Sequence, residues 1–335
     1  MSRLISDARL VDRDHWAEFV RTHPDGTIFQ SPEMYEAFRE SPVYRSFAIF
    51  YLDTHEDIKG LMVGTIQAEP GIKKPLSRRC IVNGGPLVIN RDPLILQEIL
   101  EYLQRYVCKR VIYSQLRNYS DLGWADGILK NSGFQYEDHL NILIPLDQAD
   151  ETWDRNIHKS RKRNYRRAAN KGVQFNESTD PKNLETHYNL IRQTYRRIKL
   201  PLAGLEIIRN ALEYLAGEKM IRIFSARIDQ HVIAVRLVLL YDGRMYDWYA
   251  GSDERSRSLY PNDFLIYSIL RWGNKNGYRL FDFGGAGKPG EKYGVREHKE
   301  KFGGEFTNYG RYNIIHKPTL FKLGKLGLHF YQRIH

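Results

Sequence analysis

Residues 245–285 decide the fold and read MYDWYAGSDERSRSLYPNDFLIYSILRWGNKNGYRLFDFGG. The first eight residues are typical of a strand that breaks at Gly251. Pro261 then begins an apolar helical segment that Gly277 ends, since proline fits the first turn of a helix and glycine its end. A second apolar strand follows at 280–283. This order of strand, helix and strand predicts an α/β fold.

The same order of elements occurs in both halves of the chain. The first half has predicted strands at 47–52, 58–66, 80–89, 110–116 and 140–146, and predicted helices at 92–107 and 126–130, the latter ended by Gly133. The second half has predicted helices at 151–171, 183–197 and 205–217, followed by strands at 221–228 and 232–241. We infer a tandem pair of α/β (α+β) modules, with domains at 1–147 and 148–335; chance similarity of alternating elements is the alternative.

Composition limits the class of protein. A chain of 335 residues, 42% hydrophobic and 27% charged, is long enough for two cores and too apolar to be disordered. No apolar run reaches the roughly 18 to 20 residues that span a bilayer, and two cysteines suit a reducing cytoplasm without a structural metal. The net charge of +11 favours an anionic partner, namely nucleic acid, nucleotide or anionic lipid, although a basic surface without a ligand is the alternative.

Residues 156–173 form the most basic segment, with seven Lys or Arg and no acidic residue. Helical spacing places Trp153, Ile157 and Ala168 toward the protein. The outward face then carries Lys159, Arg163, Arg166 and Arg167. Such a face binds RNA or phosphate electrostatically, or is simply solvated.

A glycine-rich loop follows the strand that ends at Asp282. The loop lacks the Gly-Lys-Ser/Thr ending of a nucleotide-binding loop, so we do not expect a nucleotide triphosphatase. Asp282 is a candidate general base, or else a structural acceptor for loop N–H groups. Backbone N–H groups near Gly251 and Pro261 are candidates to hold an acyl oxygen or a phosphate, although ordinary architecture explains both residues as well. Signatures of serine hydrolases and zinc peptidases are absent.

Taken together, these segments resemble the Fem family of peptidoglycan bridge-forming aminoacyltransferases and related GNAT-like acyltransferases. The matching elements are the basic helix ending at Gly172-Val, Tyr249-Ala-Gly-Ser252, the Pro261 helix, Phe281-Asp-Phe-Gly-Gly285 and Lys299-Glu-Lys-Phe-Gly-Gly304, with weaker matches at Ile28-Phe-Gln-Ser-Pro-Glu and Asn83-Gly-Gly-Pro86. The resemblance implies two GNAT-like domains.

The resemblance also implies roles for individual residues. Lys299 matches a lysine that assists acyl transfer, although His298 stands where the family usually has Phe. Arg39 and Lys199 match basic residues that bind substrate phosphates. The strand end formed by Tyr249, Gly251 and Ser252 is expected to contact substrate.

The expected reaction is transfer of an amino acid from aminoacyl-tRNA to an amine of a peptidoglycan precursor, without a covalent enzyme intermediate or a tightly bound cofactor. The first alternative is an acyl-CoA or acyl-carrier donor acting on an envelope polysaccharide or small amine. The second is a non-catalytic protein that binds RNA or a membrane surface. The basic, apolar segment 317–335 either contacts an anionic membrane or packs against the second domain. We expect a cytoplasmic protein, either free or peripheral to the inner face of the membrane.

Overall fold

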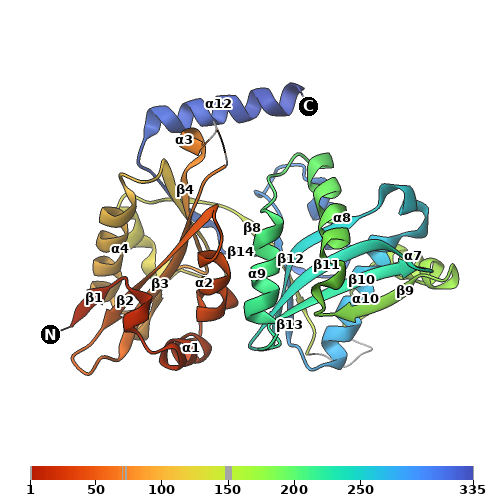
Figure 1. Cartoon of the computed structure of the whole chain (residues 1–335), viewed down its shortest axis with the longest axis horizontal. Coiled ribbons are helices and arrows are strands. Elements are labelled where there is room, and N and C mark those ends of the chain that lie inside the picture. The colour runs from red at the N-terminus through yellow and green to blue at the C-terminus, as the bar shows by residue number, and fades with distance from the viewer. Residues whose placement is uncertain (1, 70, 72–73, 148–152, 335) are drawn as a thin grey trace. The chain divides into compact units, whose positions relative to one another are not determined.

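The chain divides into two compact units. The computed structural model describes residues 2–69, 71, 74–147 and 153–334, with side chains up to 326. The first unit comprises Met1–Asp138 and Tyr309–His335, and the second comprises His139–Asn308 (Figure 1). Each unit contains one mixed sheet, so the predicted α/β fold is confirmed.

The first unit is built on a sheet of order β1-β2-β3-β4-β6-β15-β7, with β5 paired to β3. Its strands are β1 (Arg3–Ile5), β2 (Tyr44–Leu52), β3 (Ile58–Gln67), β4 (Arg79–Asn83), β5 (Leu87–Val88), β6 (Tyr113–Arg117), β7 (Gln135–Glu137) and β15 (Arg311–Ile315). Its helices are α1 (Arg13–Thr22), α2 (Pro32–Arg39), α3 (Lys74–Ser77), α4 (Pro93–Val107), α5 (Asp126–Asn131) and α12 (Pro318–Ile334).

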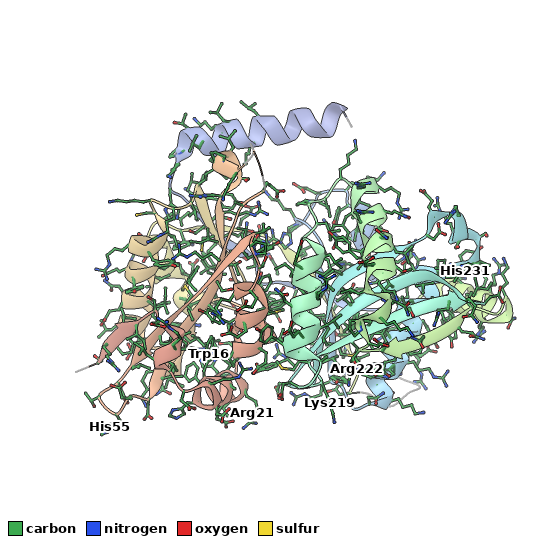
Figure 2. The ribbon with its side chains drawn as sticks, in the orientation of Figure 1. Trp16, Arg21, His55, Lys219, Arg222 and His231 are labelled. Atoms are coloured by element: carbon green, nitrogen blue, oxygen red, sulfur yellow. The ribbon has the colours of Figure 1, made fainter. Side chains whose placement is uncertain are left out.

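The core of this unit lies between α4 and the sheet. Asp92 caps α4 by accepting the backbone N–H groups of the next turn, and proline occupies the first turn. Its apolar side chains recur at helical spacing and are buried at Leu96, Ile99, Leu100, Leu103 and Val107. Trp16 of α1 packs edge-on against Phe50 of β2, with ring centroids 4.9 Å apart (Figure 2).

The second unit is built on a sheet of order β14-β8-β13-β12-β11-β10-β9. Its strands are β8 (Leu140–Pro145), β9 (Gln174–Ser178), β10 (Ile221–Ile228), β11 (His231–Tyr241), β12 (Arg244–Ser252), β13 (Leu280–Gly285) and β14 (Glu305–Asn308). Its helices are α7 (Lys159–Asn170), α8 (Leu184–Arg197), α9 (Leu205–Leu215), α10 (Pro261–Lys275) and α11 (Gly294–Glu300). Helices α7 and α10 pack together on the core face, and α8 packs on β11 and β12.

Strand assignment differs from the sequence-based prediction at two places. The predicted strand at 140–146 forms β8, but it pairs with β13 and β14 instead of completing the first sheet. The corresponding place in the first sheet, between β6 and β7, is taken by β15 from the end of the chain. Consequently residues 139–147 belong to the second unit and 309–335 to the first, whereas the predicted boundary was 147/148.

Smaller differences concern polar or glycine-containing segments. Strand β9 was missed because its sequence, QFNES, is mostly polar. Helix α7 begins at Lys159, where the His158 side chain accepts the Ser160 N–H, and not at 151; residues 148–152 lie outside the described part. Helix α12 forms despite two glycines. Phe321 packs edge-on against Tyr113 of β6, so α12 contacts the first unit. Within the described residues, no helix is long and apolar enough to cross a membrane.

Candidate active site

The parallel strands β12 and β13 separate at their carboxyl ends. They pair only where Arg244–Tyr246 lies beside Leu280–Asp282, and from there β12 continues along β11 while β13 pairs with β8. In the first unit, by contrast, the parallel strands β4 and β6 stay paired over their whole length, with residues 79–83 beside residues 113–117. Ligands of α/β proteins bind at the carboxyl ends of parallel strands, so the opening in the second unit is the candidate active site.

A β-bulge bends β12 at this opening. On β11, Val238 pairs with Asp247 and Leu237 pairs with Tyr249, which leaves Trp248 without a partner position. A bulge of this kind increases local twist and redirects the bulged strand. The bulge therefore explains why β12 leaves β13 directly after their three paired positions.

Lys299 of α11 lies at the end of β13. Its Nζ donates hydrogen bonds to the carbonyl oxygens of Phe283 at 2.5 Å and Gly285 at 3.1 Å. Burial lowers the pKa of Lys299, and the nearby Asp247 partly opposes that effect. Because an ammonium has three N–H donors, one remains for a ligand at the opening.

A buried ion pair joins β11 and β12 beside this lysine. Arg236 Nη1 contacts Asp247 Oδ2, and the two side chains are only 8% and 7% exposed. Both positive charges lie near the Phe283 ring, with Lys299 Nζ 5.5 Å and the Arg236 guanidinium 5.8 Å from its centroid. Sequence reasoning missed this pair. The available signal was a charged residue within each of two otherwise apolar strands.

Asp282 faces the loop that follows β13. Its Oδ1 accepts the Gly284 backbone N–H at 2.6 Å, and Asn141 Nδ2 lies 3.4 Å away. Burial raises the pKa of Asp282 to about 6. Gly284 still belongs to β13, so this bond makes Asp282 a structural acceptor within the strand end; its two expected roles, acceptor for loop N–H groups and general base, stay predictions.

Asp263 joins three helices behind the opening. Its carboxylate accepts from Arg161 Nη1 at 2.8 Å and Asn164 Nδ2 at 2.6 Å, both on α7, and lies 3.1 Å from His298 Nε2 on α11. Burial raises the pKa of Asp263, but the hydrogen bonds from His298, Asn164 and Arg161 outweigh it and lower the pKa overall. His298 thus combines a polar contact with Asp263 and an aromatic one, since its ring lies 5.5 Å from that of Phe302.

The other predicted residues of the β12 end make internal contacts. Tyr249 lies against Trp248, with ring centroids 4.7 Å apart. A Cβ at Gly251 would lie 2.4 Å from the Ile191 backbone nitrogen, so glycine allows α8 to approach β12. Ser252 is buried, and its Oγ accepts from Asn262 Nδ2 at 2.9 Å.

The predicted basic face of α7 is exposed. Its exposed residues include Lys159, Arg163, Arg166 and Arg167. The other two cations of the helix point inward and pair with acids: Arg161 with Asp263 and Lys162 with Asp154. The helix is therefore anchored by one set of cations and presents another to solvent.

The two predicted phosphate-binding residues lie in different units. Lys199 is exposed just after α8, with a left-handed backbone at φ 54°. Arg39 ends α2 in the first unit, where it pairs with Glu36 at 2.6 Å and Glu40 at 3.0 Å.

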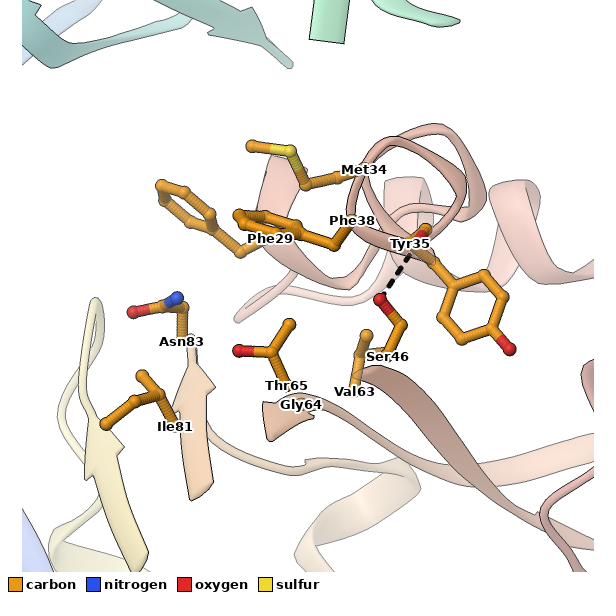
Figure 3. Close-up of a pocket in the computed structure, with 10 residues that line it drawn as sticks. All are labelled: Phe29, Met34, Tyr35, Phe38, Ser46, Val63, Gly64, Thr65, Ile81 and Asn83. Atoms are coloured by element: carbon orange, nitrogen blue, oxygen red, sulfur yellow. Dashed lines mark hydrogen bonds between the residues drawn. The ribbon is translucent and has the colours of Figure 1, made fainter. Parts of the chain in front are cut away.

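The first unit contains a small pocket beside α2 (Figure 3). Aromatic side chains and polar groups line it, including Phe29, Phe38, Ser46, Thr65 and Asn83. Phe29 and Asn83 come from the two N-terminal motifs noted in the sequence. The structure brings those motifs together at one pocket.

The part of the chain that forms this site matches a known family of proteins. Residues 155–300 match the model of the acetyltransferase (GNAT) domain. The second unit therefore contains a GNAT-type acyltransferase domain. The opening between β12 and β13, the basic helix and Lys299 all fall within the matched GNAT domain.

The Fem-type resemblance is confirmed over nearly the whole chain. A lipid II:glycine glycyltransferase of Staphylococcus haemolyticus is 20% identical over 404 aligned positions, which cover 94% of each chain. The crystal structure of FemX matches with a TM-score of 0.74 at 14% identity, covering 96% of this chain and 99% of that one. A tandem GNAT protein from the clavulanic acid pathway matches with a TM-score of 0.59 at 10% identity, over 94% and 99% of the two chains.

Proposed function

We propose that the protein transfers an amino acid from aminoacyl-tRNA to an amine of a peptidoglycan precursor. The observation that carries this proposal is Lys299, whose ammonium lies at the open ends of β12 and β13 within the GNAT domain. The likeness to a lipid II:glycine glycyltransferase along 94% of both chains supports the choice of substrates.

The reaction needs no covalent intermediate on the protein. The acceptor amine attacks the ester carbonyl carbon of the donor, forming the new C–N bond. The carbonyl oxygen gains negative charge, and the remaining N–H of Lys299 stabilises it. The C–O bond to the ribose then breaks, and the proton lost by the amine is balanced by the proton gained at the ribose oxygen. Lys299 acts here as a hydrogen-bond donor held in place by two carbonyl groups.

The exposed face of α7 supports tRNA as the donor. Four cations project from one helix, in the same unit as Lys299. Neutralising phosphates in this way gives RNA binding without sequence readout. No tightly bound cofactor is required by this scheme.

An acyl-CoA donor is the second candidate. The observation that favours it is the start of α10, where Pro261 opens the next α-helix after β12, with a short 3-10 helix (Glu254–Leu259) between them. Backbone N–H groups at a helix N-terminus attract phosphate, which coenzyme A would supply.

A donor competition separates the two candidates. Purified protein is incubated with a muropeptide precursor that has a free amine, and with either radiolabelled aminoacyl-tRNA or labelled acetyl-CoA. Label that moves from tRNA supports the proposal. Label that moves only from acetyl-CoA replaces it by the second candidate. If neither donor supplies label to lipid-linked or nucleotide-linked precursors, the proposed reaction is wrong.

We also propose that α12 contacts an anionic membrane surface, where a lipid-linked acceptor would lie. Leu323 and Leu326 are 51% and 56% exposed and are interspersed with Lys322 and Lys325. Exposed leucines next to lysines are typical of helices that lie on membranes. A chain truncated after Pro318 should lose binding to phosphatidylglycerol vesicles while its melting profile is kept. Unchanged vesicle binding by the folded truncation would contradict this role.

A further inference from the structure

Asp247 occupies the point at which the active-site opening begins. The last paired positions of β12 and β13 are Tyr246 and Asp282, and Asp247 is the next residue of β12. The bulge at Trp248 follows immediately. Asp247 therefore lies at the position where β12 begins to separate from β13.

The Asp247 carboxylate is buried, and only one of its two oxygens has a partner among the described residues. One oxygen, Oδ2, contacts Arg236, whereas Oδ1 is shielded from solvent and has no hydrogen-bond partner among the described residues. Arg236 Nε is likewise without a partner there. An unfilled acceptor on a buried carboxylate costs about 1–3 kcal/mol or more, so an ion pair serving only the core would be expected to satisfy both oxygens. The unpaired Oδ1 indicates a ligand with a donor group.

The neighbouring lysine indicates which kind of donor group fits. Lys299 is electrostatically coupled to Asp247 and offers its remaining N–H to the acyl carbonyl oxygen. In an aminoacyl ester the amino nitrogen is attached to the carbon next to that carbonyl. A site for such a group therefore needs an anion close to the cation that holds the oxygen. Asp247 and Lys299 supply this combination.

We infer that Asp247 Oδ1 binds the α-ammonium group of the donor amino acid and thereby selects aminoacyl over plain acyl donors. This inference rests on the proposed function and specifies the donor class of that same site. An acetyl group, or an amino acid acylated on its nitrogen, has no cation to offer and would leave Oδ1 desolvated and unpaired. Arg236 then acts as a positioning residue that fixes the carboxylate.

The test compares two donors that differ only at the amino group. Aminoacyl-tRNA and the same tRNA carrying N-acetylaminoacyl ester are used with wild-type protein, Asp247→Asn and a matched control, Asp242→Asn. Asp242 also pairs with an arginine, Arg279 at 3.0 Å, but lies at the other end of β12. We expect the wild-type preference in kcat/KM for the free amine to fall about 10-fold to 100-fold in Asp247→Asn, as for loss of one charged hydrogen bond. Asp242→Asn should keep the preference.

Two results would overturn the inference. If Asp247→Asn still transfers from aminoacyl-tRNA with an unchanged donor ratio, whether or not both donors are slowed, the carboxylate does not bind the amino group and the inference alone fails. If wild-type protein moves acetyl from acetyl-CoA but no amino acid from tRNA, the proposed function fails and this inference fails with it.

If Asp247→Asn does not fold, a second variant and a second measurement still test the inference. The double variant Arg236→Gln/Asp247→Asn removes both buried charges together, which avoids an unpaired arginine. Binding is then measured with 3′-aminoacylamido-3′-deoxyadenosine, a non-reactive donor mimic, and with its N-acetyl derivative. Wild type should bind the free amine more tightly, and the double variant should bind both alike. Retained discrimination by the folded double variant contradicts the inference.

Discussion

His298 Nε2 lies 3.1 Å from Asp263 Oδ1, so the residue that precedes Lys299 is tied to a buried carboxylate at the start of α10. The same carboxylate accepts from Arg161 and Asn164 of the basic helix. One acidic side chain thus joins the helix that carries the exposed cations to the helix that carries Lys299.

Replacing Asp263 by alanine should strongly destabilise the protein. The change leaves Arg161, whose side chain is 14% exposed, without its carboxylate. Breaking a buried ion pair from one side costs about 3–5 kcal/mol in free energy of unfolding. Asp242→Asn, which breaks an exposed ion pair and keeps a residue type that tolerates the positive φ of 41° there, should cost less than about 1 kcal/mol. Urea unfolding curves measure the free energy of unfolding of both variants. Equally small losses in the two would show that the junction contributes little to stability.

Substituting Gly251 by alanine should also destabilise, because the added Cβ meets the backbone of α8 near Ile191. Overpacking of this kind costs about 1–3 kcal/mol or more where backbone must move. Gly217→Ala is the control, since a Cβ at Gly217 meets no atom within 4 Å. Thermal melts should separate the two variants; a Gly251→Ala protein as stable as Gly217→Ala would show that α8 does not need the close approach.

Asp282 should make stability fall as the pH rises. Its pKa is about 6 in the folded chain against 3.8 for the ordinary group. Below pH 3.8 both states are protonated. Between 3.8 and 6 the unfolded chain releases the proton first, so the folded state is progressively disfavoured, by about 3 kcal/mol in all. Asp282→Asn keeps an acceptor oxygen and removes this titration.

The measurement for Asp282 is the free energy of unfolding of wild type and Asp282→Asn at pH 4 and pH 7. The difference between the two proteins should shift by about 2 kcal/mol in favour of the variant from pH 4 to pH 7. A difference that stays constant between the two pH values would mean that the folded carboxyl has an ordinary pKa.

Removing the exposed charges of α7 should weaken RNA binding. The variant replaces Arg163, Arg166 and Arg167 by glutamine, and the control replaces the exposed Lys182, Lys219 and Lys275 of the same unit. The slope of log K against log salt should drop by about 0.7 to 0.9 for each phosphate that the removed arginines neutralise in the wild type. Fluorescence titration with tRNA measures it. Equal weakening in variant and control would assign the effect to net charge alone.

Local sequence signals predicted most of the helices and strands, because residues such as proline and glycine mark where an element begins and ends. Pro261 and Gly277 bracket α10 closely, and the hairpin between residues 221 and 241 follows from a short polar turn. The same signals could not say which sheet a strand joins. Strand β8 reads as an ordinary apolar strand, and its partners β13 and β14 lie more than a hundred residues away.

The candidate site was predictable only in part. Lys299 was found through its motif, and the outward face of α7 through helical spacing. Asp247 and Arg236 were not found, because their relation depends on a one-residue bulge that aligns two strands. Gly251 and Ser252 were predicted to contact substrate, which stays a prediction; in the structure Gly251 lies close to α8 and Ser252 accepts a hydrogen bond from α10.

The most direct measurement is the transfer rate from aminoacyl-tRNA to a muropeptide amine in wild type, Lys299→Gln and Lys301→Gln. Lys301 is an exposed neighbour on the same segment and serves as the matched control. Loss of a preorganised donor to the carbonyl oxygen should lower kcat about 100-fold to 1,000-fold in Lys299→Gln, with Lys301→Gln near wild type. A folded Lys299→Gln protein that transfers amino acids at the wild-type rate would contradict the account.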